Sequence, residues 1–122
     1  MSTGRRPIRI LHVTFNMGFG GTEQVIRQLV SGMPTEFFEN RILCIDGYVG
    51  EIGHKLQDEG VTVSHLSRRD GFDPKLIRQL RQKILEWGID VVHCHQYTPW
   101  VYGWAASRLT GARVVFTEHG RF

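Results

Sequence analysis

The sequence predicts an α/β protein built on an open, doubly wound parallel sheet. Apolar runs of strand length alternate along the whole chain with segments whose apolar residues recur at helical spacing. A glycine-rich loop separates the first such run from the first helical segment. Five β units joined by helices favour a parallel sheet with helices on both faces. Right-handed crossovers then give the strand order 3-2-1-4-5, with its switch point between the first and fourth strands.

Each element has its own signal. Strands are expected at about residues 8–14, 41–46, 61–66, 90–94 and 113–117, and helices at about 23–33, 51–58, 74–87 and 99–109. Thr22 is the expected N-cap of the first helix, and the pairs Asp73-Pro74 and Thr98-Pro99 combine a cap with a proline at the first helical position. The 61–66 run is short and alternating, as is typical of an edge strand.

Length and charge limit the classes of protein. The 122 residues suffice for one domain, no apolar run is long enough to span a membrane, and the N-terminus lacks the core of a signal peptide. Both cysteines lie in apolar runs, so a reduced, cytoplasmic protein is expected. Lys75, Arg78 and Arg81 form a stripe, which indicates a solvated face or weak contact with an anionic membrane. Nothing indicates nucleic-acid binding.

The glycine-rich loop, residues 14–24, suggests a phosphorylated ligand, because backbone N–H groups at a helix N-terminus bind anions. Gly18 and Gly20 fit the first two positions of a dinucleotide fingerprint, but the third falls on Glu23. A nicotinamide oxidoreductase is therefore disfavoured, and no Walker lysine follows. Asp46 is interpreted as a turn residue, and the glycines could also serve only to make a tight turn.

The histidines suggest a polar site at the switch point. His93 and His95 share one face of a strand, and His119 ends the last strand. No carboxylate with suitable spacing accompanies them, so no bound metal is expected. We interpret His93 as a hydrogen-bonded core residue, and His95 and His119 as residues that meet a polar ligand. His12, inside the first strand, gives no functional signal.

Four features occur together and in order: Phe-Gly-Gly-Thr-Glu at 19–23, Arg68-Arg69, Asp-Val-Val-His-Cys-His at 90–95 and Val-Val-Phe-Thr-Glu-His-Gly at 114–120. This set resembles the N-terminal domain of the GT-B glycosyltransferases of family 4, a retaining group with two Rossmann-like domains and an active site between them. The resemblance implies a catalytic role for His119, contact of Gly20, Gly21 and His95 with the phosphates or sugar of the donor, and an acceptor site around Arg68, Arg69 and Tyr97.

The resemblance also implies an activity. A sugar would move, with retention, from a nucleotide-sugar donor to a saccharide or lipid-linked acceptor, without a metal or other cofactor. Residues 1–122 would then be one N-terminal, acceptor-side domain, truncated after its fifth strand. The second domain and its E-x7-E motif are missing, so we expect no activity from this chain alone. The expected location is cytoplasmic, peripheral at the inner face of the membrane. The alternative is a stand-alone flavodoxin-like binding or interaction module without catalysis.

Overall fold

The computed structural model describes residues 6–18 and 20–118 and contains a five-stranded, all-parallel sheet. The spatial order is β3-β2-β1-β4-β5, as expected from the sequence, with β1 in the centre. The strands are β1 (Ile8–Thr14), β2 (Phe38–Cys44), β3 (Thr62–His65), β4 (Val91–His95) and β5 (Arg113–Thr117).

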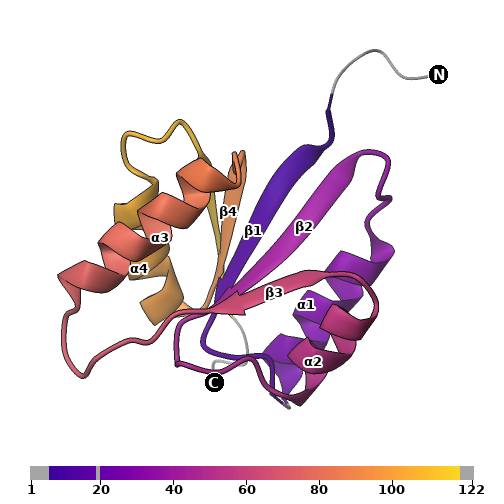
Figure 1. Cartoon of the computed structure of the whole chain (residues 1–122), viewed down its shortest axis with the longest axis horizontal. Helices are drawn as coiled ribbons and strands as arrows, with labels where there is room; N and C mark the ends of the chain where they lie inside the picture. Colours follow the sequence, from indigo (N-terminus) through magenta and orange to yellow (C-terminus); the bar gives the residue numbers. More distant parts are fainter. Residues whose placement is uncertain (1–5, 19, 119–122) are drawn as a thin grey trace.

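Helices cover both faces of the sheet, with α1 and α2 on one side and α3 and α4 on the other (Figure 1). They are α1 (Gly21–Gly32), α2 (Glu51–Asp58), α3 (Pro74–Glu86) and α4 (Tyr97–Ser107). Two buried apolar clusters match these layers, because alternate residues of β1 and β2 point to opposite faces. Within the described residues, no helix combines the length and apolar character needed to cross a membrane.

Some boundaries and caps differ from the sequence predictions. Strand β2 begins at Phe38 because it pairs with β1 over the full length of both strands. Thr22 is not an N-cap: Gly20 precedes α1, and Thr22 lies inside the helix. Thr98 is not one either, since α4 begins after Gln96. The Asp73 cap is confirmed, because its carboxylate accepts a hydrogen bond from the backbone N–H of Lys75.

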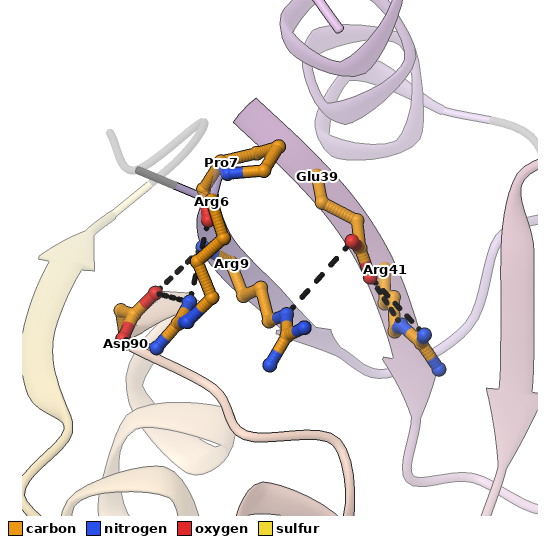
Figure 2. A network of polar contacts seen from close by, with 6 residues as sticks. All are labelled: Arg6, Pro7, Arg9, Glu39, Arg41 and Asp90. Carbon is orange, nitrogen blue, oxygen red and sulfur yellow. Dashed lines mark hydrogen bonds and ion pairs between the residues drawn. The ribbon is translucent and has the colours of Figure 1, made fainter. Parts of the chain in front are cut away.

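The amino edge of the sheet is held by ion pairs (Figure 2). The Arg6 guanidinium donates two hydrogen bonds to the carboxylate of Asp90, at 2.7 and 2.9 Å, and the backbone N–H of Arg9 donates to the same group at 2.9 Å. The hydrogen bond from Arg6 is the main cause that lowers the pKa of Asp90. On the neighbouring strand, Glu39 pairs with Arg41 at 3.1 Å. These charges therefore stabilise the edge opposite the candidate site.

Candidate functional site

The candidate site lies at the carboxyl ends of β1 and β4, the switch point of the sheet. Gln96, directly after β4, joins three elements there. Its backbone N–H donates to the carbonyl of Thr117 at 2.8 Å, and its side-chain amide donates to the hydroxyl of Thr22 at 2.9 Å. Its φ of 77° is unusual for a residue other than glycine. The edge thus contains a strained residue, which the surrounding hydrogen bonds hold in place.

The glycine-rich loop after β1 is held tightly against its neighbours. The backbone N–H of Met17 donates to the carbonyl of Val49 at 2.7 Å, and the Asn16 side chain accepts from the N–H of Gly18 at 2.9 Å. The left-handed conformation falls on Gly20, with φ 146°. A Cβ atom on Gly21 would meet nothing within 4 Å, so the turn has room for a side chain at position 21.

The side chain of Glu23 lies beside the start of α1. A Cβ atom on Gly20 would lie 2.9 Å from its Oε2. Burial raises the pKa of this carboxyl. A carboxylate interacts favourably with a helix N-terminus, and it competes there with a second anion. The chain's own acid therefore occupies part of the space that the fingerprint of a dinucleotide-binding loop leaves for pyrophosphate.

Three imidazoles gather on the α1 and α2 side of the sheet. His12 of β1 is the register partner of His93 of β4, and His95 follows two residues later. The ring centroids of His93 and His95 are 4.1 Å apart, and His12 lies 5.3 Å from each. His12 was set aside in the sequence analysis, and the structure corrects this. The prediction that β1 and β4 are neighbours already indicated this contact, because residues at the same height on neighbouring strands lie side by side.

Hydrogen bonds connect this cluster to the strands on either side. His12 Nδ1 lies 3.1 Å from His95 Nε2, and His12 Nε2 lies 2.9 Å from the side-chain oxygen of Asn40 on β2. His93 Nε2 lies 2.8 Å from the hydroxyl of Thr117 on β5. His12 and His95 have no exposed surface. His93 is thus hydrogen-bonded, as expected, whereas His95 lies behind the surface of the site rather than on it.

Burial is the main cause that lowers the pKa of His12 from 6.5 to about 4; the nearby His93 lowers it further, and the bond to Asn40 raises it. The ring is therefore neutral near pH 7. The candidate ligand atoms of the three histidines all lie within 4.8 Å of one another, and imidazole nitrogens suit Zn²⁺. Both nitrogens of His12 already have hydrogen-bond partners, however, so this ring is satisfied without an ion.

The structure separates the residues proposed for the acceptor. Arg68 donates to the carboxylate of Asp46 at 3.1 Å and lies over the ring of Phe15, 5.6 Å from its centroid. Its Nε is buried and has no hydrogen-bond partner. The side chain of Arg69 is 76% exposed and lies 3.7 Å from the capping carboxylate of Asp73. Arg68 therefore points toward the glycine-rich loop, whereas Arg69 lies at the start of α3, beside Asp73.

A surface pocket of about 420 Å³ lies between the end of β3 and the start of α3. Its charged lining residues are the cations Arg69 and Lys75 and the carboxylate Asp73, and His65 lines it as well. Arg81, the last residue of the expected basic stripe, instead donates to the carbonyls of Ala105 and Ala106 at the end of α4. One residue of the stripe, Arg81, therefore has a structural role, whereas Lys75 lines the pocket.

Three other predicted groups complete the description. Tyr97 is 61% exposed at the start of α4, with its ring centroid 5.8 Å from that of Trp100. Burial raises the pKa of Cys44 and of Cys94 to about 12, so neither thiol is a nucleophile near neutral pH. His119, the predicted catalytic residue, lies outside the described residues.

The sheet order and the flanking helices match the Rossmann-like half of a GT-B fold. The chain belongs to the glycosyl transferase 4-like domain family, which matches residues 20–122. A glycosyltransferase from Rickettsia africae has a similar structure, with a TM-score of 0.67 and 19% identity over 97% of this chain and 31% of its own. MurG of Acinetobacter baumannii has a TM-score of 0.62 and 13% identity, over 92% and 35%. The chain thus spans about a third of each. Curated protein sequences give no significant match.

Proposed function

We propose that this chain is the acceptor-side domain of a retaining glycosyltransferase that moves a sugar from a nucleotide-sugar donor to a saccharide or lipid-linked acceptor. The family match over residues 20–122 carries the proposal. The position of the glycine-rich loop, Gln96 and the end of β5 at one switch point supports it, because ligands of such sheets bind there. Backbone dipoles at this edge would stabilise charge that develops on the leaving phosphate.

Each predicted residue keeps a role in this proposal. His119 acts at the scissile bond, and the N–H groups near Gly20 and Gly21 approach the donor. His95, buried at the end of β4, packs behind the same cleft. Arg68, Arg69 and Tyr97 serve the acceptor, and the pocket beside Arg69 and Lys75 favours an anionic acceptor group. The chemistry requires no metal or cofactor. We place the whole protein in the cytoplasm, with weak contact to an anionic membrane surface through Lys75 and Arg78.

The test uses the intact protein, a panel of UDP- and GDP-sugars and a saccharide acceptor. His119→Ala should lower turnover about 10²–10³-fold, as the loss of one transition-state hydrogen-bond donor does, with an unchanged melting temperature. Near-normal turnover, or a loss that follows unfolding, would contradict the catalytic role. If the unsubstituted protein transfers no sugar from any donor, the stand-alone binding module becomes the better interpretation.

Gly21→Val probes the donor contact separately. Since a Cβ at this position meets nothing within 4 Å, the variant should fold normally. Its branched side chain should obstruct a ligand that approaches the backbone closely, and should raise KM for the nucleotide sugar. The matched control is Gly32→Val at the other end of α1, where a Cβ also meets nothing within 4 Å. Equal kinetics for the two variants would exclude close approach at Gly21.

A further inference from the structure

A row of polar side chains crosses the sheet where apolar packing is the rule. Asn40, His12 and His95 come from the three neighbouring strands β2, β1 and β4, and they are joined by contacts of 2.9 and 3.1 Å. Apolar residues of similar size usually serve a core at least as well, because every buried polar group must find a partner. The row therefore points to a purpose other than stability.

The contacts determine which nitrogens carry protons. The side-chain oxygen of Asn40 can only accept, so the nitrogen beside it, His12 Nε2, is the protonated one. A neutral ring carries one N–H, so His12 Nδ1 is an acceptor. Its partner, His95 Nε2, must then donate. With one proton on the His95 ring, Nδ1 is then the acceptor.

We propose that Asn40 and His12 are positioning residues that hold His95 in its Nε2–H tautomer at the carboxyl edge of β4. The inference rests on the proposed function, since this edge is the proposed site of sugar transfer. A ring fixed in this way presents an acceptor at Nδ1 and orients an N–H or hydroxyl donor next to it. Asn40 and His12 need no contact with substrate, because they act through His95.

The first experiment is spectroscopic and does not depend on turnover. The 122-residue chain is labelled with ¹⁵N-histidine, and the protonated nitrogen of each ring is identified by NMR at pH 7.5. His12 and His95 should both be protonated at Nε2. Asn40→Leu removes the acceptor and should produce a mixture of tautomers, whereas Asn40→Asp restores an acceptor and should restore Nε2–H on His12.

His54→Asn is the matched control, because this exposed ring on α2 is hydrogen-bonded to Gln57 of its own helix. It should leave the signals of His12 and His95 unchanged. A proton on Nδ1 of His12 would overturn the proposal. So would stoichiometric binding of added Zn²⁺ that displaces the Nε2 proton of His95, because the cluster would then be a metal centre.

The second experiment measures turnover of the intact protein. Asn40→Leu should lower kcat about 10–100-fold with little change in KM, as is typical when a hydrogen-bond partner that orients a side chain at the site is lost. Asn40→Asp should recover most of this loss. Unchanged kcat in Asn40→Leu would overturn the positioning role. If the unsubstituted protein transfers no sugar, the proposed function fails, while the NMR result still decides whether the tautomer is held.

Discussion

At the scale of single residues, burial decides the chemistry more than residue type does. His12 and His54 are both histidines, but His12 is enclosed between Asn40 and His95, whereas His54 lies on an exposed helix face. The two cysteines likewise act as apolar core residues, because burial keeps their thiols protonated. The same effect makes Glu23 a weaker acid beside the start of α1. Reactivity in this domain is therefore a property of position in the fold.

The low pKa of His12 predicts that mild acid destabilises the domain. The unfolded chain takes up a proton at His12 near pH 6.5, but the folded domain does so only near pH 4. This contribution to stability is therefore complete above pH 6.5 and is lost as the pH falls toward 4. The free energy of unfolding should decrease by up to about 3 kcal/mol over this range.

Urea denaturation at several pH values measures this effect. The comparison is with His12→Asn, which keeps an acceptor near Nδ1 and cannot titrate, so its stability should depend less on pH in this range. Equal pH dependence of the two proteins would show that His12 does not carry the effect. The two proteins are compared by the change in unfolding free energy with pH rather than by its absolute value, because the substitution also changes stability at neutral pH.

At the scale of elements, close contacts set the distance between helices and sheet. Helix α4 packs on β4 with Gly103 against Cys94, and a Cβ atom on Gly103 would overlap the Cys94 sulfur. In a similar way, Gly50 allows the loop before α2 to approach the backbone of Met17. Small residues at these points allow the helices to lie directly against the strands whose ends form the site. The geometry of the edge therefore depends on packing several residues away.

Gly103→Ala should destabilise the domain by about 1–3 kcal/mol, although alanine is the better helix former. The cause is overlap with Cys94, so adding Cys94→Ala should recover part of the loss. Gly32→Ala at the end of α1 is the control, since its Cβ would meet nothing within 4 Å, and it should be neutral or slightly stabilising. Chemical denaturation of the three proteins tests this. A stabilised Gly103→Ala would contradict the packing argument.

At the scale of the whole molecule, the two edges of the sheet differ in the residues that they contain. The amino edge contains the Arg6–Asp90 pair and the charges of Figure 2, all of which have partners within the domain. The carboxyl edge contains the glycine-rich loop, the strained Gln96 and His95 at the end of β4. Function in parallel sheets concentrates at the second kind of edge. The chain also spans only about a third of the two solved glycosyltransferase structures.

This span leads to a prediction for the isolated chain. The 122 residues should transfer no sugar and should bind a UDP- or GDP-sugar weakly or not at all, because a ligand of the proposed two-domain cleft would take its contacts from both sides. Isothermal titration calorimetry on the chain measures this directly, with the intact protein as the reference. Sub-micromolar binding by the chain alone would contradict the prediction.

The sequence alone determined the class of fold and the strand order, and it predicted the edge of the candidate site. Hydrophobic periodicity and cap signals such as Asp73-Pro74 are local, so they can be read along the chain. Gly20, Arg68 and Tyr97 were predicted as site residues from the family resemblance. Their contacts were not, since the pairing of Arg68 with Asp46 joins segments far apart in sequence.

Only the tertiary structure decided how the histidines are used. His12 looked like an ordinary strand residue until the register of β1 and β4 placed it against His93 and His95. Helix α1 begins after Gly20, and Thr22, inside the helix, accepts a hydrogen bond from Gln96 across the switch point. Local propensity cannot predict such bonds, since they depend on where the sheet brings distant residues together. The fold follows from short-range patterns, whereas the chemistry of the site follows from long-range contacts.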